Sequence, residues 1–379
     1  YAKGFSNEND SMTEQELEKA LRTAAEADVA VIFAGLPEIF ESEGYDRTSM
    51  KLPQCQDRLI EEVLKVQPNV VVVLHNGSPV ELPWADKVSA ILEMYLGGQG
   101  VGEACDRLLY GEANPSGRLA ETFPYRLEDN PSFLHFPGNG KRVLYGEDIF
   151  VGYRYYDTKK VPVRYAFGHG LSYTEFAYGD LNLSSAQMTD EDILTVSFKV
   201  KNAGKTEGKE VVQLYVADLC GTPERPVKEL KGFAKVHLLP GEEKTVSMEI
   251  LARDLSYYEE RLGDWYAPSG TYRILIGHAS DDIRLHADIV FETQKELPLR
   301  VDFTTTFGEL LDHTKTAPVI TELLAPLATA AASAEGMSDE YKKLGEQVIR
   351  EMPMKSLLGQ MPGEQVEQLI GQLNCLLAQ

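Results

Sequence analysis

The chain has 379 residues, of which 43% are hydrophobic and 25% charged, a composition typical of globular proteins that form two or three domains at this length. Its net charge of −22 argues against nucleic acid and anionic membranes as partners, because both are negatively charged, and is compatible with neutral substrates. The sequence has no run of about 18 apolar residues, so we predict no membrane span.

The N-terminus and the cysteines bear on the cellular compartment. The chain opens on Tyr1 without the basic, apolar and small-residue pattern of a signal peptide, so we interpret its start as an internal cut. The cysteines are scattered, without the Cys/His spacing of a zinc site, at positions 55, 105, 220 and 375. Scattered thiols fit a reducing compartment, and we expect a cytoplasmic location unless a signal peptide precedes Tyr1. We expect no cofactor and no metal.

Helix and strand patterns alternate over the first 110 residues. A capping box at 13–16 predicts a helix that continues to about residue 28. The apolar run over 29–35 predicts a buried parallel strand. The further expected elements are a helix over 57–66, strands over 70–74 and 89–96, and a helix from 102 to about 110. Short loops between alternating helices and strands predict an α/β layered sandwich domain with a parallel sheet.

The rest of the chain changes character twice. Residues 114–170 are rich in proline, glycine and aromatic residues, and we expect a long irregular segment held by packing, with a functional or interfacial role. Period-two patterns then predict strands over 194–202, 210–216, 230–236, 245–250 and 270–277. These strands predict an all-β sandwich of immunoglobulin or fibronectin type III-like architecture. We expect domains over 1–178 and 179–298, followed by a tail over 299–379 with two or three short helices, broken at the Ala-rich stretch 324–334 and at Pro353.

The loop Glu41–Arg47 is the first candidate for chemistry. It follows the strand over 29–35, and in parallel sheets the carboxyl ends of the strands are where ligands bind. Glu43 is a candidate proton donor of a glycosidase, whose acid needs a pKa raised towards neutrality. Gly44 lets the loop adopt conformations that present this side chain. The alternative is that Glu41 and Glu43 belong to an ordinary solvated loop.

Other motifs favour structural readings. Gly98–Gly102 lacks the Gly-x-Gly-x-x-Gly spacing of a dinucleotide loop and predicts a tight strand-to-helix turn. The histidines have no metal spacing, and His169 is interpreted as structural. Ser78 and Ser172 lack the context of a serine nucleophile. Four tyrosines could stack on sugar rings or pack between domains, at positions 153, 155, 156 and 165.

Four stretches together resemble the non-barrel portion of glycoside hydrolase family 3 β-glucosidases, and they occur in the family's order. They are Glu41–Arg47, Tyr110–Leu119, Phe150–Asp157 and Phe167–Thr174. The tail around 352–357 also resembles tails of bacterial members.

The resemblance implies that the α/β part is the family's second domain and that the β part is its fibronectin-type third domain. It implies that Glu43 is the general acid/base in retaining hydrolysis of terminal β-D-glucosyl residues. As our own hypothesis, Asp46 and Arg47 support this residue by holding the loop and tuning its charge. The expected substrate is a β-glucoside or oligosaccharide.

The family's nucleophile is an Asp of an N-terminal (β/α)8 barrel, and neither Trp84 nor Trp265 lies in the matching context. We therefore expect a fragment, or one part of a two-chain enzyme, that needs a barrel domain or chain as its partner. The sequence does not decide whether the chain forms a homo-oligomer. The rival hypothesis is a non-catalytic carbohydrate-binding or interaction module.

Overall fold

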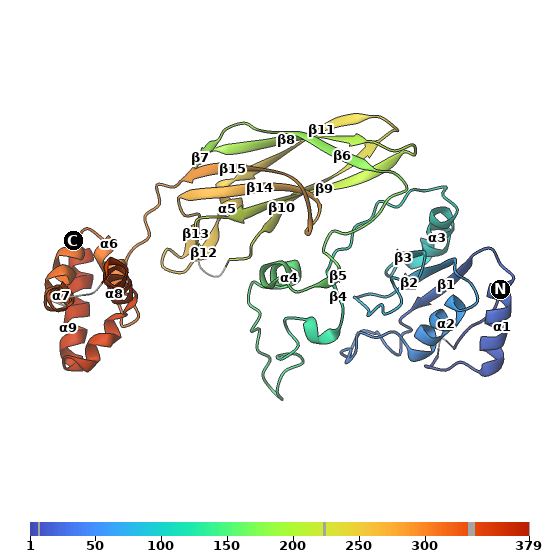
Figure 1. Cartoon of the computed structure of the whole chain (residues 1–379), viewed down its shortest axis with the longest axis horizontal. Coiled ribbons are helices and arrows are strands. Elements are labelled where there is room, and N and C mark those ends of the chain that lie inside the picture. The colour runs from blue at the N-terminus through green and yellow to red at the C-terminus, as the bar shows by residue number, and fades with distance from the viewer. Residues whose placement is uncertain (7, 223–224, 333–337, 379) are drawn as a thin grey trace. The chain divides into compact units, whose positions relative to one another are not determined.

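The computed structural model describes residues 1–6, 8–222, 225–332 and 338–378 (Figure 1). The chain forms two compact units, one of residues 1–256 and 267–294 and the other of residues 257–266 and 295–379. Within the described ranges, no helix combines the length and the apolar character needed to cross a membrane. The predicted domain boundaries at 178 and 298 stay predictions.

The first unit begins with a three-stranded parallel sheet in the order β1-β2-β3, whose strands lie side by side in Figure 1. Its elements are α1 (Glu14–Ala25), β1 (Ala30–Gly35), α2 (Gln54–Leu64), β2 (Val70–His75) and β3 (Ala90–Glu93). The predicted capping box is confirmed, because Thr13 Oγ1 accepts from the Glu16 N–H at 3.2 Å and Glu16 Oε2 accepts from the Thr13 N–H at 2.9 Å. The sequence therefore sets the start of α1 locally.

The core of this sheet lies on one face, where apolar residues of both helices pack against the strands. Leu17 of α1 and Ile60 of α2 join Ile32 of β1 in this cluster. The prediction that β1 is buried was wrong for its other face, where Val31 and Phe33 are 42% and 53% exposed. β1 is an edge strand, and α1 and α2 pack on the face that carries Ile32, so the remaining side chains stay uncovered.

The segment between β3 and the β-sandwich is largely irregular over residues 114–170, as predicted. Its elements are η1 (Gly98–Gly100), α3 (Val101–Leu109), β4 (Phe123–Pro124), η2 (Leu127–Asp129), α4 (Tyr153–Lys159) and β5 (Val163–Tyr165). The glycine run forms a single 3-10 turn that leads into α3, which is the predicted turn. β4 and β5 pair antiparallel. Packing holds the ends of this segment, whereas several apolar side chains between them are exposed, including Leu134, Leu144 and Tyr145.

A β-sandwich completes the first unit and confirms the predicted fold class. One sheet has the order β10-β9-β14-β15-β7 and the other has the order β11-β8-β6. Its elements are β6 (Phe176–Leu183), β7 (Gln187–Thr189), β8 (Ile193–Asn202), β9 (Gly208–Asp218), β10 (Glu229–Leu238), β11 (Glu243–Leu251), α5 (Ala252–Leu255), β14 (Gly270–Ala279) and β15 (Asp282–Glu292). Alternate residues such as Phe198 on β8 and Ile274 on β14 fill a shared core between the sheets.

The second unit combines a short hairpin with helices. Its elements are β12 (Tyr257–Glu259), β13 (Asp264–Tyr266), α6 (Phe307–Asp312), α7 (Ala317–Ala332), α8 (Asp339–Glu351), η3 (Met354–Gly359) and α9 (Gly363–Leu377). Four α-helices in the described part exceed the two or three predicted. The Ala-rich stretch continues α7 instead of breaking it, since alanine is the best helix former, and residues 333 and 334 lie outside the described residues. The break at Pro353 is confirmed, because α8 ends before it and η3 begins after it.

Candidate active-site loop

Loops that follow the three parallel strands meet at one edge of the sheet. β1 leads into the loop over 36–53, β2 into the loop over 76–79 and β3 into residues 94–97. Parallel strands place their carboxyl ends at the same edge, where side chains of different loops can converge on a ligand. A hydrogen bond from the backbone N–H of Gly77 to Glu41 joins the first loop to the second.

The two ends of the predicted stretch 41–47 are tied to each other and to the second loop. Glu41 Oε1 accepts a hydrogen bond from Ser78 Oγ at 2.7 Å and lies 3.4 Å from Arg47 Nη1. Glu41 Oε2 accepts from the Gly77 N–H at 2.6 Å. Arg47 Nη1 also donates to Ser78 Oγ and, at 3.3 Å, to the carbonyl of Pro79. The Glu41 and Arg47 side chains are 19% and 17% exposed, so solvent screens this ion pair less than an open surface pair.

The tip of the loop carries Glu43 outward. Glu43 is exposed, and its carboxylate has no hydrogen bond or ion pair with any residue that the structure describes. Gly44 has a φ of +101°, a backbone conformation that favours glycine and turns the chain at the tip. The Tyr45 hydroxyl donates to the Glu38 carbonyl at 2.6 Å and holds one flank. Asp46 is exposed and contacts no partner in the described ranges, so the structure ties Arg47 but not Asp46 to the loop.

A half-buried carboxyl group underlies this edge. Glu93, the last residue of β3, accepts hydrogen bonds from the Tyr95 N–H at 2.8 Å and from Asn76 Nδ2 at 3.2 Å. Asn76 Nδ2 also donates to the Ser78 carbonyl at 3.0 Å, which connects the loop over 76–79 to the end of β3. Burial raises the pKa of Glu93 to about 7 although these hydrogen bonds oppose the shift. Burial, followed by the charge of Glu41, also raises the pKa of Glu121.

Some buried polar atoms at this edge have no protein partner. Arg47 Nη2, Asn76 Oδ1 and Tyr95 Oη are buried and make no hydrogen bond to any described residue. Buried polar atoms are nearly always paired, so these three are available to water or to a ligand group. The residues described contain no group of three or more His, Cys, Asp or Glu side chains that could hold a metal ion.

Sequence reasoning missed Asn76 and Glu93. The usable signal for Glu93 was an acid at the end of an apolar strand in a parallel sheet, where ligands bind. Asn76 had the same signal, since it follows directly after β2. The hydrogen bond from Asn76 Nδ2 to Glu93 joins the loop after β2 to the end of β3. A contact between residues this far apart in the sequence cannot be predicted from a local pattern.

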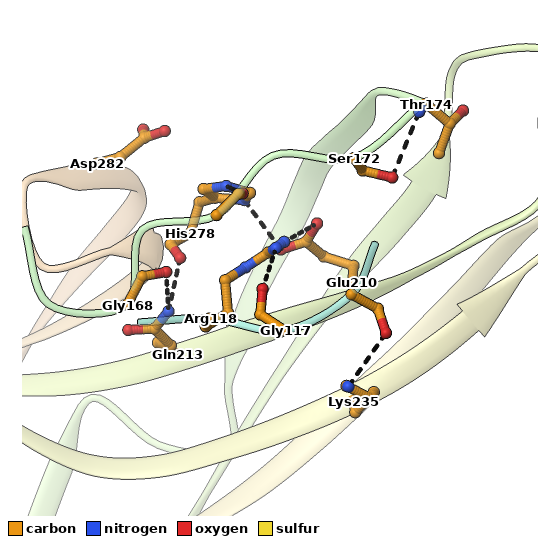
Figure 2. A network of polar contacts seen from close by, with 12 residues as sticks. Gly117, Arg118, Gly168, Ser172, Thr174, Glu210, Gln213, Lys235, His278 and Asp282 are labelled. Carbon is orange, nitrogen blue, oxygen red and sulfur yellow. Dashed lines mark hydrogen bonds and ion pairs between the residues drawn. The ribbon is translucent and has the colours of Figure 1, made fainter. Parts of the chain in front are cut away.

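Three of the four motif stretches attach the irregular segment to the β-sandwich. Figure 2 shows Arg118, Glu210 and His278 pointing toward one another. Arg118 Nη2 donates to both carboxylate oxygens of Glu210 at 3.0 Å, and His278 Nδ1 lies 2.9 Å from Glu210 Oε1. Burial would raise the pKa of Glu210, but the His278 hydrogen bond and the charge of Arg118 outweigh it and lower the pKa. This buried network is structural, because its polar groups face one another rather than a loop edge.

Neighbouring contacts extend the same attachment. Gln213 Nε2 donates to the carbonyl of His278 at 2.6 Å and to that of Gly168 at 3.3 Å (Figure 2). Tyr153 stacks on Phe167 with ring centroids 4.8 Å apart, and its hydroxyl oxygen accepts a hydrogen bond from the Leu230 N–H at 2.7 Å. For Tyr153 these contacts favour packing against the sandwich over sugar stacking.

His169 also has a structural environment. Its ring stacks on Tyr165 with centroids 4.9 Å apart, and burial lowers its pKa. This stacked and largely buried ring fits the structural role expected from the sequence.

Comparison with known proteins supports the order of these parts. Residues 2–173 match the glycosyl hydrolase family 3 C-terminal domain, and residues 210–280 match the fibronectin type III-like domain. The thermostable β-glucosidase B of Acetivibrio thermocellus is 46% identical over 99% of this chain and 50% of its own length. The β-glucosidase of Kluyveromyces marxianus is 45% identical over 75% of this chain and 33% of its own length.

Solved structures show the same relationship. The crystal structure of a Bifidobacterium adolescentis family 3 β-glucosidase superposes with a TM-score of 0.78 at 38% identity, over 84% of this chain and 47% of that chain. The Kluyveromyces marxianus β-glucosidase in complex with glucose gives a TM-score of 0.70 at 43% identity, over 74% of this chain and 33% of that chain. This chain thus spans about half, or less, of the length of the relatives it matches. It belongs to glycoside hydrolase family 3 and corresponds to the C-terminal portion of its members.

Proposed function

We propose that this chain is the acid/base-bearing portion of a retaining β-glucosidase, with Glu43 as the general acid/base. The single observation that carries the proposal is the contrast at the loop: its base is anchored, while the carboxylate at its tip is exposed and has no partner among the described residues. An anchored loop presents a side chain at a reproducible place, and an unpaired carboxylate is free to exchange a proton.

The chemistry follows from the position of Glu43. In the first step Glu43 protonates the glycosidic oxygen as the bond to the leaving group breaks, and in the second it takes a proton from the attacking water. Covering the loop with substrate and a second domain would exclude bulk water from the carboxyl at its tip. Asp46 and Arg47 are the proposed supporting residues, and Arg47 has the contacts for it.

A retaining enzyme needs a second carboxylate as nucleophile, and we assign it to an N-terminal (β/α)8 barrel. The named relatives are about twice the length of this chain or more, which leaves room for a barrel of about 250 residues. The proposed substrates are β-glucosides or oligosaccharides with terminal β-D-glucosyl residues, because the relatives are called β-glucosidases. Residues 1–379 alone should therefore be inactive.

The test is Glu43→Gln in the enzyme that joins this chain to the barrel. Gln keeps the shape and cannot donate the proton, so kcat/KM for substrates with poor leaving groups should fall by about 10²–10⁴. Aryl glucosides whose phenolate leaves without protonation should lose far less. Glu18→Gln, an equivalent change on the exposed side of α1, is the control and should match wild type. An equal loss across all leaving groups, or no loss, would rule Glu43 out.

One observation favours a second candidate, a non-catalytic module that binds carbohydrate or another protein. The irregular segment exposes large aromatic side chains, including Phe136 and Tyr145, which are 50% and 80% exposed. Titrating the full chain with glucose and cellobiose, first alone and then with a barrel, separates the two candidates. Tight sugar binding by the chain alone favours the module, and binding only in the presence of the barrel favours the enzyme.

A further inference from the structure

We propose that Glu41 is a positioning residue for the acid/base loop, acting through a clamp made of Glu41, Arg47, Gly77 and Ser78. This inference rests on the proposed function of Glu43. The clamp closes the base of the loop and leaves residues 42–46 as a short tip whose direction is fixed from both ends.

The two neighbouring glutamates are in opposite states. Both carboxylate oxygens of Glu41 are occupied, Oε1 by Ser78 and Arg47 and Oε2 by the Gly77 N–H at 2.6 Å. Glu43, two residues further on, has no partner in the part of the chain that the structure describes. A carboxylate that accepts from three donors holds its loop in place, and its oxygens are not available to a substrate. A carboxylate without such partners can accept or donate a proton at a substrate. We therefore assign different roles to the two glutamates: Glu41 holds the loop, and Glu43 is the acid.

The clamp fixes both ends of the tip at once. Arg47 meets Glu41 at 3.4 Å, so the residues that flank the tip are held together across the loop. Ser78 lies between them, donating to Glu41 Oε1 at 2.7 Å and accepting from Arg47 Nη1. Within the tip itself, Tyr45 supplies the tie to the rest of the loop, through its bond to the Glu38 carbonyl. Without the clamp, the position of Glu43 would depend on that one contact.

A second layer holds the clamp in place. Asn76 Nδ2 donates both to the Ser78 carbonyl at 3.0 Å and to Glu93 Oε2 at 3.2 Å. The loop over 76–79 is thereby fixed to the last residue of β3, and Asn76 is completely buried. The clamp thus connects the exposed tip to the rigid sheet through two loops. Misplacing a catalytic group by about 1 Å can cost a factor of about 10² in rate, so this connection bears on catalysis.

The test is Glu41→Gln in the enzyme that includes the barrel, beside Glu43→Gln and the control Glu18→Gln. Gln has nearly the same size, but its NH₂ group cannot accept from the Gly77 N–H and it carries no charge for Arg47. We expect kcat/KM to fall by about 10–10² for poor leaving groups and by less for good ones, because proton delivery is what suffers. A merely structural role would lower the rates of all substrates equally.

Ser78→Ala is the milder second variant, in case Glu41→Gln reduces folding. It removes one hydroxyl that bridges Glu41 and Arg47, and we expect the same dependence on leaving group with a smaller loss. Amide hydrogen exchange over 42–46 should also be faster in both variants than in Glu18→Gln.

The outcomes separate the two proposals. If Glu43→Gln shows the leaving-group-dependent loss and both clamp variants match wild type, the clamp is refuted and the proposed function stands. If Glu43→Gln loses no activity, the proposed function fails and the positioning role fails with it. If the clamp variants lose activity equally for all leaving groups, Glu41 is structural and the inference is overturned.

Discussion

Replacing Arg118 by Met should destabilise the first compact unit by about 3 kcal/mol, the lower end of the range for breaking a buried ion pair. Arg118 and Glu210 are 6% and 0% exposed, and two hydrogen bonds of 3.0 Å join them. The substitution leaves the Glu210 carboxylate buried without the cation that contacts both of its oxygens. His278 and Tyr178 still contact Glu210, at 2.9 and 3.0 Å, which is why we expect the lower end.

A matched control lies in the same sandwich. Arg273 and Asp288 are also joined by two hydrogen bonds, at 2.7 and 2.9 Å, which Nε and Nη2 each donate to one carboxylate oxygen, but their side chains are 39% and 42% exposed. Solvent-exposed pairs contribute about 0–1 kcal/mol, so Arg273→Met should cost little. Urea unfolding of the full chain, followed by circular dichroism and by fluorescence of the buried Trp84, measures both variants. If Arg118→Met costs no more than Arg273→Met, burial does not set the strength of this network.

Two further predictions concern stability. Because the pKa of Glu93 in the folded protein is raised to about 7, the free energy of unfolding should fall as pH rises from about 4.5 to 7. Glu93→Gln should remove up to about 3 kcal/mol of this pH-dependent change, as measured by urea unfolding across the same pH range. An unchanged pH dependence in Glu93→Gln would contradict the assigned burial. Gly168→Ala should cost at least about 2 kcal/mol, because Gly168 has a φ of +83° and a Cβ there would collide with the Gln213 amide. Gly241→Ala, with a similar φ of +77° and open space around it, should cost only about 1 kcal/mol in the same urea unfolding experiments. If the two glycine substitutions lower the free energy of unfolding equally, the collision at residue 168 is relieved in the variant.

Local patterns predicted the parts of the fold that depend on neighbouring residues. The Thr13 capping box, the alternation along β8 and the glycine turn before α3 all have their causes within a few residues. Burial of β1 was predicted from an apolar run, but an apolar run does not say whether both faces are covered, and Phe33 is exposed. β6 and β15 were not predicted, although apolar residues alternate along β15 from Ile283 to Phe291.

In the candidate site, too, the sequence predicts what depends on neighbouring residues and misses the contacts between distant ones. Glu43 was selected from its place after a strand and from the resemblance to a family, both of which the sequence displays. The partners of Glu41 lie 36 and 37 positions away at Gly77 and Ser78, and they meet only because β1 and β2 are parallel neighbours. The raised pKa of Glu93 depends on burial by several elements, which a linear sequence does not show.

Azide rescue of Glu43→Ala, in the enzyme that joins this chain to the barrel, tests the assignment of Glu43 most directly. Azide is a nucleophile that needs no general base, and it fits the space that the shortened side chain leaves. With an activated aryl β-glucoside, the variant should be slow in buffer, should recover turnover when azide is added, and should release β-glucosyl azide. Turnover at the wild-type rate without azide, or no azide product despite a slow variant, would contradict Glu43 as the acid/base.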